Sequence, residues 1–168
     1  SNVVLSGCLA TGSVNMPVTT WPVDGAGGVV GTTNNGQIEL SGCISSVNIH
    51  SSNGAAGIIA EAGSTSIIAD SIAVGLVSED RNKGRAIVGT RNSPFVGNSY
   101  WAVDATGQVA NQGYADSYGV LLNELKCPTA ANNSSCAASN LYMGWDTYLN
   151  DDGAPMFDFG RSDQLPGI

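Results

Sequence analysis

The sequence predicts an all-β fold, specifically a right-handed parallel β-solenoid of about three coils. Two landmarks carry this prediction because each recurs at a nearly fixed spacing. The first is a small residue that ends a Val/Ile-rich run, and it returns every 29 residues (Gly31, Ala60, Gly89). The second follows another apolar run and returns at spacings of 35, 28 and 28 residues (Cys8, Cys43, Ser71, Ser99). A period of this length is typical of stacked supersecondary units.

Each copy of the repeat contains three apolar runs of three to six residues, cut by Gly, Asn and Ser. Such runs are too short for helices and favour short strands. Stacking the copies places Val29 beside Ile58 and Ile87, and Ile38 beside Ile67, in one continuous interior. The alternative is an ordinary β-sandwich with coincidental self-similarity, but two landmarks with the same spacing favour the solenoid.

Taken in order, residues 1–14 complete one coil, and residues 15–24 hold a six-residue excess over the next copy. Two prolines in this excess argue against a central strand, so we expect a loop. Trp21 on this loop is a candidate sugar-stacking platform, or else a side chain folded over the solenoid edge. The coils 28–60 and 57–89 follow. His50, a single histidine between them, is predicted to be a solvated turn residue.

After Trp101 the repeat stops and aromatic residues become frequent, with eight of the eleven lying in residues 101–168. We therefore predict two regions in one structural unit: solenoid repeats over 1–103 and a C-terminal cap over 104–168 that packs on their open end. The cap is expected to contain one short helix over 118–126, with Ser117 as its N-cap.

The four cysteines are compatible with an oxidising compartment. Cys127 and Cys136 flank a loop of polar turn-forming residues, and a disulfide closing that loop is expected. Cys8 and Cys43 occupy equivalent repeat positions, about 4.8 Å apart if the strands stack. They could form a second disulfide or remain a ladder of two buried thiols, and the sequence leaves both open.

The chain has a net charge of −8, and charged residues make up only 12% of it. An acidic surface repels phosphate backbones and anionic lipids, which argues against nucleic-acid binding and peripheral membrane attachment. The sequence contains no run of 18 apolar residues, so no membrane insertion is expected. The first residues enter in the middle of a repeat, which suggests a fragment or mature piece of a longer protein.

Motifs for catalysis are scarce, and we expect no enzyme. The sequence lacks Gly-x-Ser-x-Gly, a zinc-binding His pair and a Cys–His couple clear of the expected disulfides. A polysaccharide lyase or glycosidase would need carboxylates, for which Glu39, Asp70 and Asp104 are the candidates, but Glu39 and Asp70 lie at non-equivalent repeat positions.

No cofactor is expected, with calcium as the one alternative. Hard oxygen ligands gather near the C-terminus at a spacing that matches no EF-hand loop (Asp146, Asn150, Asp151, Asp152, Asp158). Asp-Asp-Gly is also an ordinary turn sequence. For a carbohydrate ligand, the candidate contacts are the aromatic residues Trp21, Tyr142 and Trp145.

Three stretches resemble proteins that carry the GLUG motif. They are the Gly-Gly-Val-Val-Gly run at 27–31 with Asn35-Gly36, the Asn-Ser-Tyr-Trp stretch within 98–108, and the ending with Trp145-Asp146, Asp158-Phe159-Gly160 and residues 164–167. The chain departs from the pattern at Arg85-Ala86, where Gly-Gly is expected. The resemblance implies a large secreted or surface-attached bacterial polypeptide, often adhesin-like and in other cases the non-catalytic region of a secreted peptidase. It implies no catalytic residue.

The sequence and the resemblance together predict a structural or adhesive module outside a bacterial cell, at its surface or secreted. Its expected partners are an extracellular glycan or protein surface, or another copy bound through the ends of the solenoid. The alternatives are a carbohydrate-binding module and the non-catalytic region of a secreted peptidase or polysaccharide-degrading enzyme.

Overall fold

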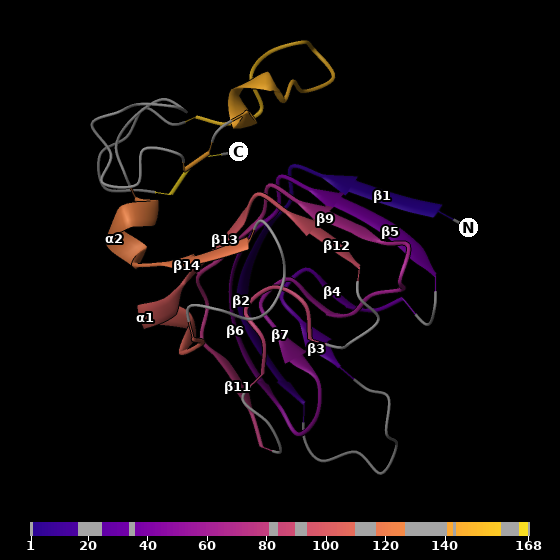
Figure 1. Ribbon diagram of the computed structural model, residues 1–168, viewed down its shortest axis with the longest axis vertical. Coiled ribbons are helices and arrows are strands. Elements are labelled where there is room, and N and C mark those ends of the chain that lie inside the picture. Colours follow the sequence, from indigo (N-terminus) through magenta and orange to yellow (C-terminus); the bar gives the residue numbers. More distant parts are fainter. Residues whose placement is uncertain are drawn as a thin grey trace.

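A computed structural model describes residues 2–16, 25–33, 36–80, 84–89, 94–109, 117–126, 141–142, 144–158 and 165–167 of the chain. Within these ranges the protein is mostly β, built from short parallel strands with few helices (Figure 1). The helical segments are α1 (Val103–Thr106), α2 (Leu122–Leu125) and the 3-10 turn η1 (Trp145–Thr147). None of these described helices is long enough to cross a bilayer.

The strands form two larger parallel sheets and two small ones. Sheet A has the order β1 (Asn2–Ser6), β5 (Gln37–Ser41), β9 (Ile67–Ala69), β12 (Phe95–Gly97). Sheet B contains β2 (Leu9–Met16), β6 (Ile44–Ser51), β10 (Ile72–Ala73), β11 (Val77–Glu79), β13 (Ser99–Ala102) and β14 (Ser117–Val120). The small sheets pair β3 (Ala26–Gly27) with β7 (Ala55–Ala56) and β4 (Val30–Thr32) with β8 (Ile59–Glu61).

The chain returns to the same sheets in successive passes, which we number by residue: 2–33, 36–61, 67–89 and 95–102. The register shifts by 35 residues from the first pass to the second in sheets A and B, as in Leu9 opposite Ile44. It shifts by 28 from there on, as in Ile44 opposite Ile72 and Ile72 opposite Tyr100. The small sheets keep a shift of 29. These values confirm the spacing of the two sequence landmarks.

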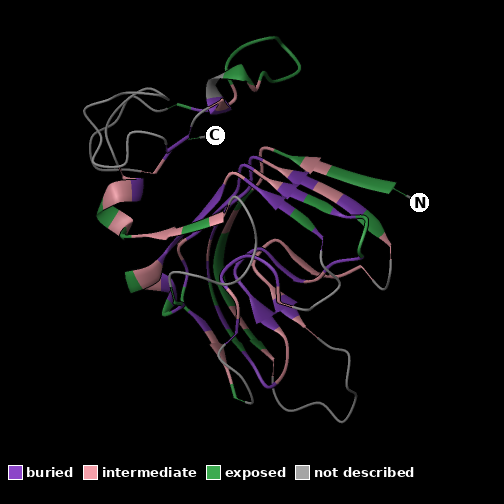
Figure 2. Cartoon of the chain, in the orientation of Figure 1, coloured by how far each residue is buried: buried purple, intermediate pink, exposed green. Residues whose placement is uncertain are grey.

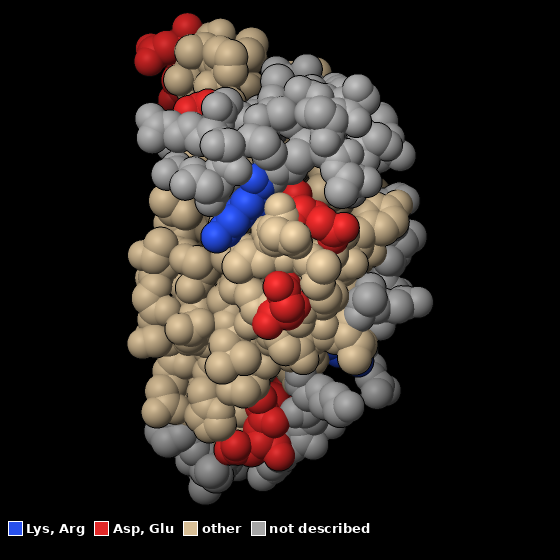
Figure 3. All heavy atoms as spheres, turned by 90° about the vertical axis from the view of Figure 1, so that its left-hand side faces the viewer, with Lys and Arg blue, Asp and Glu red and all other residues tan. Residues whose placement is uncertain are grey.

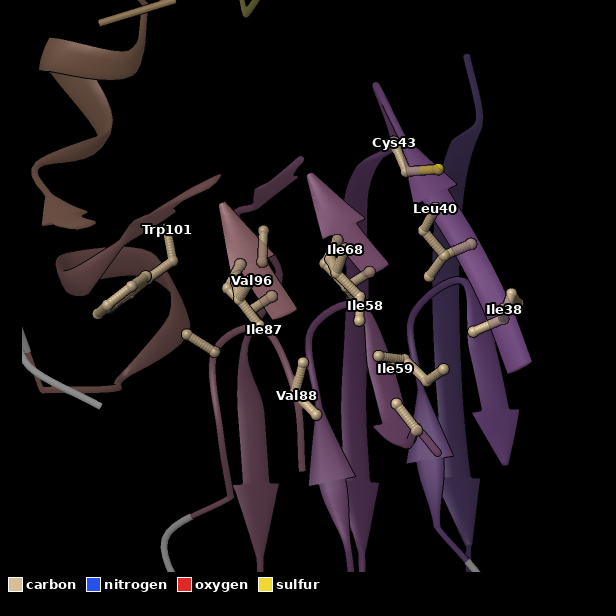
Figure 4. Close-up of a cluster of buried hydrophobic side chains, with 13 residues drawn as sticks. Ile38, Leu40, Cys43, Ile58, Ile59, Ile68, Ile87, Val88, Val96 and Trp101 are labelled. Carbon is tan, nitrogen blue, oxygen red and sulfur yellow. The ribbon is translucent and has the colours of Figure 1, made fainter. Parts of the chain in front are cut away.

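The main core lies between the sheets and stacks similar side chains from successive passes (Figure 4). Ile58 and Ile87 are buried within it and Val29 packs against it, as the 29-residue period predicted. The expected pair Ile38 and Ile67 is wrong by one residue. Because sheet A has a period of 28, Ile67 lies opposite Glu39 and faces outward, while Ile38 points into the core. A slip of one residue exchanges the two faces of a strand.

A corner of left-handed backbone joins sheet A to sheet B in every pass. The residues there have φ between 43° and 62° (Gly7, Gly42, Asp70, Asn98). Gly, Asn and Asp are the residues that adopt this conformation at least cost. Gly42 is required for space as well, since a Cβ added there would lie 2.7 Å from the ring of Phe157.

The residue after each corner forms a polar ladder (Cys8, Cys43, Ser71, Ser99). Each side chain donates to the carbonyl two residues before it, at 3.8 and 3.6 Å for the two thiols and 2.8 and 2.9 Å for the two hydroxyls. The disulfide considered between Cys8 and Cys43 is not formed in this structure, where both are free cysteines. Strictly stacked side chains that share one hydrogen-bond pattern point in the same direction, which explains the two separate thiols.

The C-terminal aromatic residues cover an outer face of sheet B. The sequence predicted instead that they would cover the end of the stack. The covered row runs Ile44, Ile72, Tyr100 and belongs to one buried cluster with Tyr142, Trp145 and Phe157 from the C-terminal segment. The end of the stack after β13 is met instead by β14, α1 and α2.

The helix predicted over 118–126 is correct only in its second half. Residues 117–120 form β14, which pairs with β13 from Ser99–Ser117 to Ala102–Val120. Ser117 is therefore a strand residue and caps no helix. α2 begins after Leu121, whose amide donates to Glu124 Oε2 at 2.7 Å, and the amide of Leu122 donates to Asp104 Oδ1 at 2.9 Å.

Candidate functional site

The outer face of sheet A carries exposed apolar side chains on three of its four strands. They lie in a row that crosses four neighbouring strands in register: Val4, Glu39, Ile67 and Phe95. Val4 is 59% exposed, Ile67 37% and Phe95 60%, while Glu39 is half-buried between them. We call these four residues the sheet A row. An exposed apolar face of this kind is suited to contact with a surface or an extended polymer.

The residues next to the sheet A row are small, so the backbone lies close to the surface there. They occupy the adjacent outward register position (Ser6, Ser41, Ala69, Gly97). The ring of Phe95 lies over Gly97, where an added Cβ would be only 2.8 Å from the ring. The glycine thus lets the ring rest on the sheet while much of it stays in contact with solvent.

A hydrogen-bonded cluster stands at the corner beside this row. Asn98 Nδ2 donates to Asp70 Oδ1 at 2.6 Å, and the Tyr100 hydroxyl donates to Asn98 Oδ1 at 2.8 Å. The hydroxyl of Tyr148 donates to the second carboxylate oxygen of Asp70. We call Asp70, Asn98, Tyr100 and Tyr148 the Asp70 cluster. It ties the corner of the third and fourth passes to the C-terminal segment.

Burial controls the protonation of the tyrosines in the Asp70 cluster. It raises the pKa of Tyr148 well above its usual value, and the hydrogen bond to Asp70 and the negative charges of Asp70 and Glu39 raise that pKa further. Burial likewise raises the pKa of Tyr100 to about 12. Both hydroxyls therefore remain protonated donors at physiological pH, so neither is suited to act as a general base.

Two carboxylates at non-equivalent repeat positions both raise the pKa of the Tyr148 hydroxyl. Glu39 lies on β5 and Asp70 follows β9 one pass later, yet both raise the pKa of this one hydroxyl. The third candidate carboxylate, Asp104, lies in α1 and accepts the amide of Leu122. Its contact holds the two helices together, away from the Asp70 cluster.

His50 is exposed, in agreement with its prediction as a solvated residue, but it is a strand residue and does not lie in a turn. It lies in β6 and reaches two residues of the next pass, with Nδ1 3.0 Å from Ser78 Oγ and Nε2 3.5 Å from Asp80 Oδ1. Ser78 Oγ also lies 3.1 Å from the carbonyl oxygen of Ile49. The hydroxyl thus has two neighbouring acceptors at similar distance, this carbonyl oxygen and Nδ1 of the imidazole, and the tautomer of His50 decides which of them takes the proton. The 28-residue register, which puts Ser78 opposite His50, was the signal that could have revealed this contact.

Two of the predicted ligand-contacting residues are buried and unsuited to that role. Tyr142 is covered by the cluster it shares with Trp145, and its hydroxyl donates to the carbonyl of Leu125 at 2.5 Å. The ring centroids of Tyr142 and Trp145 lie 5.0 Å apart, edge to face. The sequence did not reveal the outward row of sheet B that these aromatics cover (Ile44, Ile72, Tyr100). They were therefore predicted to contact a ligand.

Several predicted site residues lie outside the described residues, namely Trp21, Cys127 and Cys136, and only the backbone of Asp146 is described. Asp151 and Asp152 are exposed in a turn whose Asn150 Oδ1 accepts the amides of Asp152 and Ala154 at 3.0 and 2.9 Å. Asp158 is exposed and its backbone pairs with Gly167. In the part of the chain that the structure describes, no three His, Cys, Asp or Glu side chains gather as a metal site.

Charge is sparse on the molecule. On the side that carries α1, α2 and β14, acidic side chains are scattered and basic ones are scarce (Figure 3). Comparison with protein-family models, curated proteins and solved structures finds no match for this chain.

Proposed function

We propose that this chain is a right-handed parallel β-solenoid of about three coils that serves as a structural and adhesive module, without catalysis, in a larger bacterial surface or secreted protein. The observation that carries the proposal is the sheet A row, in which Val4, Ile67 and Phe95 are exposed on one face of a parallel sheet. Four parallel strands hold these side chains at a fixed spacing, which suits attachment to an extended surface.

The resemblance to GLUG-motif proteins supports the extracellular location and the bacterial surface as its setting. The absence of catalysis is supported by the chemistry of the described side chains. The Tyr148 hydroxyl is held as a donor to Asp70, and the Tyr142 hydroxyl as a donor to the backbone carbonyl of Leu125. These groups are better suited to stabilising the fold than to catalysing a reaction.

A binding screen with matched variants tests the proposal. The labelled chain is applied to arrays of immobilised polysaccharides and extracellular matrix proteins, beside Phe95→Ala and the control Leu76→Ala, which removes another exposed apolar side chain (51% exposed) away from sheet A. We expect a retained ligand, and at least about tenfold weaker binding for Phe95→Ala alone. Binding that both variants lose equally, or that neither loses, contradicts the assignment of this face.

A carbohydrate-binding module is the second candidate, and the position of the Phe95 ring favours it. The ring rests on Gly97 with 60% of the residue exposed, beside the half-buried carboxylate of Glu39. Sugars stack on exposed aromatic rings, and their hydroxyls donate hydrogen bonds to neighbouring carboxylates. Phe95→Trp distinguishes the two candidates: a sugar ligand should be retained or bound more tightly, whereas a protein surface fitted to phenylalanine should be lost.

A further inference from the structure

The polar ladder at the corners contains two kinds of side chain. Its first and second rungs are Cys8 and Cys43, and its third and fourth rungs are Ser71 and Ser99. All four donate to the carbonyl two residues before them, the thiols at 3.8 and 3.6 Å and the hydroxyls at 2.8 and 2.9 Å. A hydroxyl is therefore sufficient for this contact. What the two thiols add is sulfur, which binds soft metal ions such as copper(I).

The two thiols occupy neighbouring rungs of the ladder. Leu9 lies opposite Ile44 in the parallel pair of β2 and β6, so Cys8, one residue earlier, stands opposite Cys43. Their side chains point the same way and interact directly. Neighbouring strands are about 4.8 Å apart, and the two sulfur atoms keep about this spacing. With metal–thiolate bonds of about 2.3 Å, a linear sulfur–metal–sulfur unit spans about 4.6 Å. The ladder therefore holds the two sulfur atoms at the separation that such a unit requires.

Backbone amides of the ladder face the side chains of the next rung. The amide of Cys43 donates to Ser71 Oγ at 3.3 Å, and the amide of Ser71 donates to Ser99 Oγ at 3.3 Å. In the same way, the backbone of Cys8 hydrogen-bonds to the Cys43 side chain and favours its charged form. Metal ligands are commonly held by a hydrogen bond of this kind, which orients them and supports their charge. A metal-bound sulfur at Cys43 would therefore have its donor already in place.

The surroundings of the two thiols select the kind of ion. Buried residues dominate the second and third passes (Figure 2), and Cys43 is fully buried in the main core beside Leu40 (Figure 4). Cys8 packs against the same apolar cluster. Among the residues that the structure describes, no third His, Cys, Asp or Glu joins the pair. Structural zinc sites use four ligands, whereas copper(I) is soft and is bound by two thiolates in a line. The donor set therefore fits copper(I) and does not fit zinc.

We propose that Cys8 and Cys43 form a copper(I) site, in which their two sulfur atoms bind one ion in a line and tie the first pass to the second. Each thiol gives up its proton, so one copper(I) ion replaces two protons and no electron is transferred. Both ligands and the backbone donor lie within these two passes, so the site is the same whatever packs against the first pass. It is also separate from the sheet A row and does not depend on what that row binds.

Titration of the reduced whole chain with copper(I), without oxygen and against a coloured copper(I) chelator, tests the proposal. The background variant Cys127→Ser/Cys136→Ser removes the other two cysteines of the chain. We expect it to bind one ion, and its melting temperature to rise as the ion is added, because the ion binds the folded chain. Cys8→Ser and Cys43→Ser should each weaken binding by more than about 100-fold, the upper range for losing a residue that only supports a ligand. Both should stay folded, since serine already fills two rungs of the ladder.

The unaltered chain is titrated beside the background variant. Introducing Cys8→Ser into it should remove one bound ion, whatever Cys127 and Cys136 contribute. This comparison keeps the test decisive if the background variant does not fold.

A shifted pair of thiols gives the matched control. Adding Ser71→Cys to Cys8→Ser places the second thiol on the other side of Cys43, at the next rung, and should restore the binding of one ion. Ser64→Cys on the same background adds a thiol in the exposed turn between β8 and β9 and should not restore it. Circular dichroism reports whether each variant is folded. A folded, reduced chain that leaves copper(I) with the chelator overturns the proposal, as does binding that survives the loss of either cysteine. Equal restoration by both added thiols overturns it too, because the spacing of the ladder would then be irrelevant.

Discussion

The buried hydroxyl of Tyr142 makes one of the contacts that fix the C-terminal segment. It donates to the carbonyl of Leu125 at the end of α2. Tyr142→Phe should lower the free energy of unfolding by about 1–3 kcal/mol, because it leaves that buried carbonyl without its donor. Tyr118→Phe, at a residue 49% exposed, should change it by less than about 0.5 kcal/mol. Urea unfolding measures both, and equal effects would contradict the role given to the hydroxyl.

The direction of two isoleucines gives a sharper test of register. Ile58→Asp buries a carboxylate without a partner and should prevent folding, at a cost of several kcal/mol. Ile67→Asp makes the same change on the outer face of sheet A and should be tolerated within about 1 kcal/mol. Circular dichroism and thermal melting compare the two. A folded Ile58→Asp, or an unfolded Ile67→Asp, would show that the register is misassigned.

The thiol of Cys43 makes stability depend on alkaline pH. Burial, with a hydrogen bond to Cys8, raises the pKa of Cys43 from 9.0 to about 12. Above pH 9 the unfolded chain loses this proton while the folded chain keeps it, so stability falls as pH rises, by up to about 1.4 kcal/mol per pH unit. Cys43→Ser supplies the hydroxyl already present at Ser71 and Ser99. It should remove about half of the loss between pH 9 and 10, since buried tyrosines such as Tyr142, whose pKa is raised above the usual 10.0, cause the rest. Urea midpoints follow the loss, and an unchanged slope would contradict this.

At the scale of elements, replacing a glycine that has left-handed backbone conformation costs stability in two ways, through conformation and through packing. Gly42→Ala must adopt φ of 62° and also meet the Phe157 ring. Gly153→Ala must adopt φ of 77° with no atom within 4 Å of the new Cβ. We expect about 1 kcal/mol of destabilisation at Gly153 and at least about 2 kcal/mol more at Gly42. Chemical unfolding measures the difference. Equal losses of unfolding free energy would mean that the Phe157 ring moves aside without destabilising the fold.

Elements that follow the repeat could be predicted, and elements that depend on contacts outside it could not. The 29-residue period placed Val29, Ile58 and Ile87 correctly because each pass repeats the environment of the one before. The segment 118–120 was predicted to be helical, with Ser117 as its N-cap, from its local pattern alone. Pairing with β13 over four residues made it a strand, which is a tertiary effect that no local propensity contains.

At the scale of the whole molecule, the C-terminal region acts as a cover for sheet B. Removing residues 104–168 should uncover the row Ile44, Ile72, Tyr100 and remove the cover of β13. We expect the fragment 1–103 to aggregate and to bind a hydrophobic dye, as light scattering and fluorescence would show. A monomeric fragment 1–103 that melts cooperatively would contradict this view.

The candidate site was less predictable than the fold for the same reason. Glu39, Asp70 and His50 were each visible as chemical groups, but their partners lie one pass away or, for Tyr148, 78 residues along the chain. The sheet A row required the exact register, since a shift of one residue turns Ile67 from core to surface. Trp21 and the Cys127–Cys136 pair stay predictions.

The first and second passes differ in length but not in register, and this has a practical consequence. Nine residues separate β2 from β3, against three between the equivalent strands β6 and β7, yet Met16 still lies opposite Ser51 and Ala26 opposite Ala55. The stack therefore accepts six additional residues at this junction without any change in strand pairing. The same junction one pass later, at 52–54, is a natural place to graft a foreign peptide. Grafts in successive passes would be displayed at the spacing of neighbouring strands, about 4.8 Å apart.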